Sequence, residues 1–150
     1  MSYVDTILEP GEQVRYRTSI SWTIYANGIW IALAALLCAY VGLKFYAGWL
    51  FAVSGALGLI ALALFAVAHI KRLSTEIAVT DRRIIFKQGL VRRHTVEMNM
   101  TKIESVDVNQ SILGRILNYG DVTILGVGEG RETIKTIASP LAFRNFITAR

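Results

Sequence analysis

Two long apolar runs decide the fold class of this chain: WTIYANGIWIALAALLCAYVGL at Trp22–Leu43 and GWLFAVSGALGLIALALFAVAHI at Gly48–Ile70. Neither run contains Asp, Glu, Lys or Arg. As a helix the first would be about 33 Å long, which is enough to cross the hydrocarbon core of a bilayer, and the second has a similar length. Only residues 44–47 separate them. We therefore predict a transmembrane hairpin of two antiparallel helices, with both chain ends on one side.

Basic residues near the ends of the two runs predict the orientation of this hairpin. Lys44 alone marks one side, whereas four basic residues flank the other: Arg15, Arg17, Lys71 and Arg72. By the positive-inside rule, both termini should be cytoplasmic. Residues 1–21 contain three acidic residues and no small-residue cleavage site, so we expect both runs to be retained as anchors. The sequence thus predicts a multi-pass membrane protein whose residues 1–21 form a cytoplasmic N-terminal segment.

The composition agrees with a chain that lies partly in lipid and partly in water. Hydrophobic residues make up 53% of the 150 residues and charged residues only 18%, which is too apolar for an ordinary soluble domain. The net charge of +5 arises after the second run, because Lys71–Arg150 holds thirteen basic and eight acidic residues. A basic excess beside a membrane predicts contact with anionic headgroups, or it only sets the topology, and both interpretations stay open.

From residue 74 onward the apolar residues recur with a period of two, which predicts a compact, mainly β domain over 74–150. The expected strands lie at 75–80, 84–88, 93–98, 103–109, 121–125 and 131–137. The fourth of these alternates weakly, with Ile103 on one face and Val106 and Val108 on the other. Residues 12–19 also alternate and could add a strand to the same sheet.

A short helix or turn and a final helix are expected within the β domain. Ser111 is a suitable N-cap for a helix over 111–117, whose apolar residues share one face: Ile112, Leu113, Ile116 and Leu117. Ser139 and Pro140 favour the start of a final helix, in which Phe143, Phe146 and Ile147 share a face. We predict that the chain ends in this second helix.

The residue types needed for catalysis or metal binding are scarce. The single cysteine, Cys38, lies inside the first apolar run, and neither histidine falls in a metal-binding motif. The glycine-rich stretch 126–130 lies between two expected strands and not before a helix, which predicts a hairpin turn and not a phosphate-binding loop. We expect no catalytic residue, no metal and no cofactor. Nucleic acid is not an expected partner, because no aromatic platform or recognition helix accompanies the basic residues.

The candidate ligand-binding residues are basic and lie around the first two turns of the β domain: Arg82, Arg83, Lys87, Arg92 and Arg93. Arginine side chains suit phosphate and carboxylate oxygens, which they bind in pairs. Hairpin strands would bring the five close together, although alternate residues on a strand point to opposite faces. They predict a site for anionic lipid headgroups, or else solvated turns beside a membrane.

The run VTDRRIIFKQGLVRRHTVEMNMTKIESVDVNQSILGRILNYGDVTI at 79–124 resembles the bacterial pleckstrin-homology-like domain, also described as the membrane-flanked domain of DUF304 type. The preceding apolar hairpin and the opening LeuGluProGlyGlu at 8–12 are similar to members of this family as well. Relatives often carry a HisTrp pair before the first membrane helix, whereas here Ser21 precedes Trp22. Any role tied to that histidine is therefore absent from this chain.

The resemblance implies a PH-like split β barrel, closed at one end by the C-terminal helix and attached to a bacterial cytoplasmic (inner) membrane. It does not imply phosphoinositide binding, because fold and function must be argued separately. Our first hypothesis is a membrane-anchored binding or assembly module that recruits a protein or peptide at a sheet edge or groove. The alternatives are recognition of anionic lipid headgroups by the basic residues, and an accessory subunit or homo-oligomer that docks through small residues of its helices.

Overall fold

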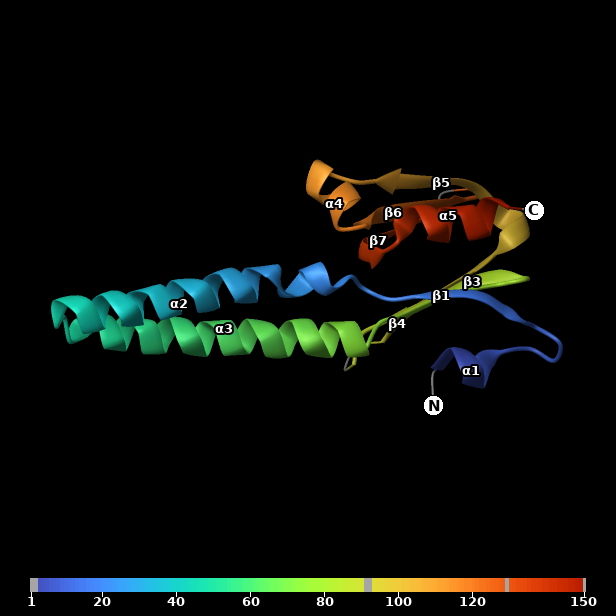
Figure 1. Cartoon of the computed structure of the whole chain (residues 1–150). Helices are drawn as coiled ribbons and strands as arrows, with labels where there is room; N and C mark the ends of the chain where they lie inside the picture. The colour runs from blue at the N-terminus through green and yellow to red at the C-terminus, as the bar shows by residue number, and fades with distance from the viewer. Residues whose placement is uncertain (1–2, 91–92, 129, 150) are drawn as a thin grey trace. The chain divides into compact units, whose positions relative to one another are not determined.

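The computed structural model describes residues 3–90, 93–128 and 130–149. They form two compact units, each of which is described here by itself (Figure 1). The helical unit comprises Ile24–Ile70. The β unit comprises the chain up to Thr23 together with the chain from Lys71 onward. The β unit is therefore assembled from segments on both sides of the helical unit in the sequence.

The helical unit is an antiparallel hairpin (Figure 1). A 3₁₀ turn, η1 (Trp22–Tyr25), leads into α2 (Ala26–Phe45), and α3 (Trp49–Leu73) returns. α2 ends at Tyr46, whose left-handed backbone (φ 52°) reverses the chain. The apolar helical stretches have 24 and 25 residues, long and apolar enough to cross a membrane. The predicted helical hairpin is thus confirmed, with α2 and α3 extending a few residues beyond the apolar runs.

Small residues allow the two helices to pack closely. A Cβ added to Gly28 would lie 3.2 Å from the ring of Phe65, and one added to Gly42 would lie 3.2 Å from Cβ of Leu50. The Ser54 hydroxyl donates a 2.9 Å hydrogen bond to the carbonyl of Ala35. The contacts within the hairpin therefore involve small residues of α2, whereas the small-residue row of α3 formed by Gly48, Ala52 and Ala56 is exposed.

The first sheet of the β unit has four antiparallel strands in the order β1-β2-β3-β4. These are β1 (Val14–Thr18), β2 (Glu76–Thr80), β3 (Arg83–Gln88) and β4 (His94–Asn99). The N-terminal segment does add a strand, because β1 pairs with β2. A short helix, α1 (Tyr3–Ile7), precedes it.

The second sheet has three antiparallel strands in the order β5-β6-β7. Its elements are η2 (Met100–Lys102), β5 (Ile103–Asn109), α4 (Ile112–Ile116), β6 (Tyr119–Gly126) and β7 (Arg131–Ala138). An isolated bridge between Ile20 and Ile137 joins the segment after β1 to β7. The chain ends in α5 (Pro140–Thr148), which lies against strands of both sheets (Figure 1). Two sheets closed by a C-terminal helix confirm the predicted PH-like architecture.

The main core lies between the two sheets and is covered by α5. Apolar residues at alternate strand positions point into it, and Phe143 and Ile147 enter it from the helix. Strands β2 and β3 are also buried on the reverse face, where Ala78 and Ile85 pack against Val4 of α1. This second cluster explains why β2 and β3 consist of nearly continuous buried residues.

A bulge resolves the weak alternation of β5. Ile103 pairs with Gly126 and Ser105 pairs with Leu125, so Glu104 is an extra residue between two successive partners. An extra residue changes which face the following side chains occupy. Ile103, Val106 and Val108 therefore all pack against the core, whereas strict alternation placed Ile103 on the opposite face from the two valines.

Candidate functional site

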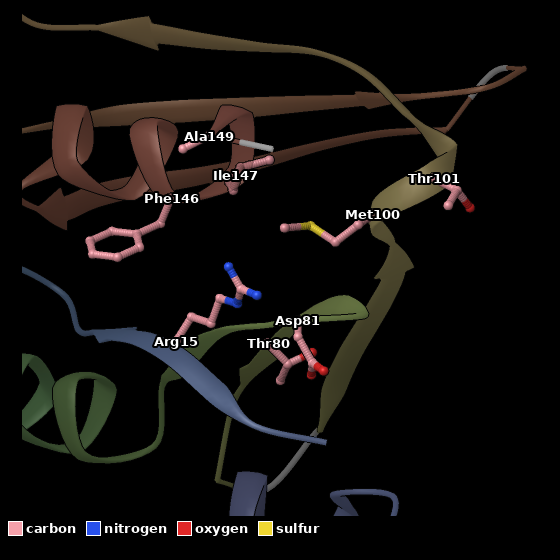
Figure 2. Close-up of a pocket in the computed structure, with 8 residues that line it drawn as sticks. All are labelled: Arg15, Thr80, Asp81, Met100, Thr101, Phe146, Ile147 and Ala149. Atoms are coloured by element: carbon pink, nitrogen blue, oxygen red, sulfur yellow. The ribbon is translucent and has the colours of Figure 1, made fainter. Parts of the chain in front are cut away.

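A cavity of about 300 Å³ lies at the C-terminal end of α5, between β1, the β2–β3 turn and η2 (Figure 2). We refer to it as the Arg15 groove, after the basic residue that extends into it. Its lining residues are Arg15, Thr80, Asp81, Met100, Thr101, Phe146, Ile147 and Ala149. They come from both termini of the β unit and from the junction of its two sheets, so only the folded chain assembles this site.

A β-bulge directs Arg15 into the groove. Val14 pairs with Thr80 and Tyr16 pairs with Val79, so Arg15 is an extra residue on β1. Bulges re-aim side chains relative to a regular strand. The side chain of Arg15 extends from β1 toward Met100 and the end of α5 (Figure 2), and its neighbour Tyr16 packs against the core beside the same helix.

One side of the groove is apolar. The ring of Phe146 stacks on Tyr16 with centroids 4.6 Å apart and an angle of 15° between the planes, yet Phe146 keeps 42% of its surface exposed. Ile147, the next residue of α5, is buried, and Met100 lies across the groove (Figure 2). An aromatic face that is fixed from behind and open in front offers an apolar ligand group a rigid contact.

The polar side of the groove has one cationic side chain, Arg15, beside Thr80, Asp81 and Thr101. The hydroxyl of buried Thr80 is already engaged by the Glu12 carboxylate and by the backbone of Arg83. The Asp81 carboxylate accepts a 3.0 Å hydrogen bond from the backbone N–H of Gln13. Within the part of the chain that the structure describes, Arg15 has no carboxylate at ion-pair distance. Its guanidinium therefore keeps its donors for an anionic group.

A second cavity of about 240 Å³ adjoins the Arg15 groove along β5. The two cavities share Met100 and Ile147, and the second is further lined by Ile103, Glu104, Ser105, Val106 and Thr148. Among the described strands, β5 pairs with β6 alone. An unpaired strand edge can hydrogen-bond to an extended peptide. The joint surface thus combines an unpaired arginine, an exposed aromatic ring and a strand edge.

Next to the groove, a buried ion pair fastens the N-terminal segment to β3. Arg83 donates through Nε and Nη2 to the two carboxylate oxygens of Glu12, at 3.0 and 2.8 Å. It also donates to the carbonyl of Ile7 and to the carboxylate of Glu97. The Glu12 side chain is fully buried and that of Arg83 is 19% exposed. Arg83 therefore has a structural task, which is to hold the start of the chain against the sheet.

The environment of Glu12 stabilises its charged form. Burial by itself raises the pKa of this carboxyl, but the hydrogen bonds from Arg83, from the backbone of Glu9 and from Thr80 outweigh it and lower the pKa to about 2. The same pair raises the pKa of Arg83, chiefly through its hydrogen bond to Glu12. Both groups are charged near neutral pH, and each neutralises the other.

The family model described as the bacterial PH domain matches residues 19–148, well over half of the chain. The chain belongs to the bacterial PH domain family. The match begins before η1 and continues into α5, so it covers the apolar hairpin and the β unit from residue 19 onward, whereas α1 and β1 precede it. Comparison with curated proteins and with solved structures found no match.

The PH domain places the five predicted basic residues in different surroundings. Arg82 pairs with Glu9 at 3.0 Å and Arg83 with Glu12, both at the β2–β3 turn. Lys87 lies four residues further along β3, about 13 Å away for an extended strand. It pairs with Glu76 at 3.6 Å and lies 4.6 Å above the ring of Tyr3. Three of the five therefore have intramolecular partners.

Arg93 lies just before β4 and is exposed, and Arg92 falls outside the described residues. The structure thus separates Arg82 and Arg83, at the β2–β3 turn, from Lys87 and Arg93, which lie at the opposite end of β3, where Gln88 pairs with His94. A common role of the five in ligand binding stays a prediction. In the described part of this PH domain, no three His, Cys, Asp or Glu side chains gather in a way that could hold a metal ion.

Sequence reasoning missed the Arg15 groove. Arg15 counted only as a charge that sets topology, and Phe146 only as one of three apolar residues on a helical face. The stretch EQVRYRTS at 12–19 reads as regular alternation, so it carries no sign of the bulge at Arg15. An earlier signal was the acidic residue Glu12 beside Pro10 and Gly11, which marks a turn that holds a carboxylate near the sheet.

Proposed function

We propose that this PH domain is a membrane-anchored binding module, and that its Arg15 groove takes an extended peptide that carries an acidic group. The observation that carries the proposal is the guanidinium of Arg15, which has no ion-pair partner among the described residues, beside the exposed ring of Phe146. Other arginines near the groove, Arg82 and Arg83, are engaged by carboxylates of the same chain. PH domains of this family are in general non-catalytic binding modules.

The proposed mode of binding is strand addition. A peptide that pairs with the free edge of β5 would gain backbone hydrogen bonds. Its alternate side chains would reach the second cavity, which shares Met100 and Ile147 with the Arg15 groove. An acidic side chain or a terminal carboxylate would then accept hydrogen bonds from Arg15. An apolar residue next to it would lie on Phe146, where burial of both surfaces stabilises the complex.

Membrane anchoring by α2 and α3 is part of the proposal. Leu36, Leu37, Leu59 and Leu62 are each between 63% and 71% exposed, and a helix that is apolar on its exposed faces is stable in lipid but not in water. Basic residues gather at one end of the hairpin, namely Arg15, Arg17, Lys71 and Arg72, and Lys44 is alone at the other. We therefore propose a multi-pass arrangement in the bacterial cytoplasmic membrane with both termini cytoplasmic.

The test begins with the full chain in lipid nanodiscs and a phage-displayed library of random peptides. We expect enrichment of peptides in which an Asp, a Glu or the free C-terminus neighbours an apolar residue. Arg15→Ala should weaken the selected peptide about tenfold, the effect of removing one charged hydrogen bond. Arg131→Ala is the matched control, because Arg131 is exposed on β7 and does not line the groove. Equal affinity of the Arg15→Ala variant and the parent chain would exclude the groove.

Recognition of anionic headgroups by the five basic residues is the second candidate, and it has one observation in its favour. Arg93 is exposed, and no carboxylate of the described chain lies at ion-pair distance from it. If this candidate holds, hydrogen exchange in β4 should slow in nanodiscs that contain phosphatidylglycerol relative to neutral ones, and the double variant R82A/R93A should abolish the difference. A lipid-independent exchange rate in the parent chain would leave the peptide groove as the function.

A further inference from the structure

The short helix α4 has its apolar face turned outward. Within it and at its end, Ile112 is 79%, Leu113 63%, Ile116 73% and Leu117 39% exposed. The residue that faces the β unit is Gly114, where an added Cβ would lie 2.7 Å from the carbonyl oxygen of Tyr119. The sequence favours a helix that packs its large residues inward, and the structure has the reverse, because only a glycine fits against β6.

Hydrogen bonds hold α4 in this orientation. Ser111 caps its start by accepting from the backbone N–H of Gly114 at 3.0 Å. The Gln110 side chain donates to the carbonyls of Gly114 and Tyr119, at 3.3 and 3.0 Å. Asn118, whose backbone is left-handed (φ 52°), closes the turn into β6 by donating to the Ser139 hydroxyl. The exposure of the apolar face is therefore a fixed feature of the fold.

α4 lies at the corner of the β unit from which the chain departs for the first apolar helix. The N–H of Ser139 donates to the carbonyl of Asn118, directly after α4, and that of Ala138 donates to Ser19. The N–H of Ser21 in turn donates to Thr136 on the same strand, β7. The end of α4 thus lies one strand spacing from the end of β7, and residues 19–21 lie one spacing from β7 as well. The end of α4 and residues 19–21 are therefore about 10 Å apart. The β unit ends two residues later, at Thr23.

The one charged residue of the segment 110–120 is basic. Arg115 lies within the helix and is exposed, and the segment 110–120 contains no acidic residue. Trp22, at the point where the chain departs, is 51% exposed. Exposed apolar side chains beside an arginine and a tryptophan suit the interface of an anionic bilayer. There, apolar side chains reach the hydrocarbon and the arginine meets the negatively charged headgroups.

We propose that α4 is an interfacial membrane contact, with Ile112, Leu113 and Ile116 inserted below the headgroups of the same bilayer that α2 and α3 span and with Arg115 at the lipid phosphates. This inference rests on the proposed membrane anchoring. It adds a third attachment point to the two chain connections and so restricts the rotation of the β unit. The groove and the strand edge of β5 would then have one defined orientation relative to the membrane when a partner binds.

The experiment uses the full chain in nanodiscs of phosphatidylcholine and phosphatidylglycerol, with Cys38→Ala as background. An environment-sensitive fluorophore is attached to Ile116→Cys, and lipids with a nitroxide at a shallow acyl position serve as quenchers. We expect severalfold stronger quenching than at Val127→Cys, a matched control because Val127 is 66% exposed and lies at the other end of β6. Since both positions are exposed, the substitutions should leave the fold intact.

A third label, at Leu36→Cys near the middle of α2, separates the two proposals, and for this label the nitroxide is placed near the end of the acyl chain. Quenching at Leu36→Cys together with quenching at Ile116→Cys supports the interfacial contact. Quenching at Leu36→Cys with none at Ile116→Cys keeps the anchoring and overturns the contact of α4 with lipid, whether the label there is in water or shielded by a second copy of the chain. No quenching at Leu36→Cys overturns the anchoring itself, and the inference about α4 with it.

Discussion

The guanidinium of Arg83 donates to both carboxylate oxygens of Glu12, a residue 71 positions earlier in the chain and on the other side of the helical hairpin. One buried ion pair thus connects the N-terminal segment with β3. Because the two residues belong to segments separated in sequence by α2 and α3, the contact forms only when the β unit has closed. The first prediction therefore concerns this ion pair.

Glu12→Gln should destabilise the β unit by about 2 kcal/mol, because it replaces the fully buried carboxylate partner of Arg83 with a neutral amide and leaves Arg83 only its more exposed partners, Glu97 and Glu9. The measurement is urea unfolding of the full chain in detergent micelles, followed by hydrogen exchange in β2 and β3. Arg17→Gln is the control, since its ion pair with Asp5 is about half exposed at both side chains and such pairs contribute less than about 1 kcal/mol. Equal losses in the two variants would show that burial of the Glu12 pair has no special effect.

The lowered pKa of Glu12 predicts that the β unit loses stability in acid. Its pKa falls from 4.5 to about 2 on folding, so the unfolded chain binds the proton more tightly than the folded chain. The stabilisation is complete above about pH 4.5 and is lost as the pH falls toward 2. Unfolding free energies measured over this range should decline in the parent chain. The part of the decline that is due to Glu12 should be missing in Glu12→Gln, and parallel curves would contradict the assignment.

Gly114→Ala should destabilise the β unit, although alanine is the better helix former by about 1 kcal/mol. The new Cβ would meet the Tyr119 carbonyl at 2.7 Å, so α4 must shift away from β6, at a cost of about 1–3 kcal/mol. Gly130→Ala is the control, because nothing lies within 4 Å of the position of its added Cβ. Thermal unfolding in micelles tests the sign, and a stabilised Gly114→Ala variant would mean that α4 is free to move.

Two phenylalanines of α5 should separate stability from binding. Phe143 is fully buried in the core, so Phe143→Ala should lower the unfolding free energy by about 3–5 kcal/mol. Phe146→Ala removes a half-exposed ring stacked on Tyr16 and should lower it by only about 1 kcal/mol. Phe146→Ala should nevertheless weaken a peptide selected on the parent chain, measured by fluorescence polarisation in nanodiscs. Unchanged peptide affinity would remove Phe146 from the proposed contact surface.

Local patterns in the sequence were sufficient for most of the elements, but not for α1 or the two 3₁₀ turns. The absence of charge over Trp22–Leu43 and Gly48–Ile70 predicts the helical hairpin, and the period of two after residue 74 predicts the strands that follow. Ser111 also caps α4 as predicted. These features are readable because helix and strand periods, caps and turns depend on residues within a few positions of each other.

The tertiary structure alone decided how those elements present their side chains. The bulge at Arg15 depends on register with β2, some 65 residues away, and the bulge at Glu104 on register with β6. Arg82 and Arg83 pair with carboxylates of the segment between α1 and β1, and Lys87 pairs with one on the neighbouring strand β2. The outward face of α4 follows from a close approach of Gly114 to Tyr119. Composition counts charges and apolar residues, but pairing and exposure are set by which segments meet, and that depends on the packing of the whole β unit.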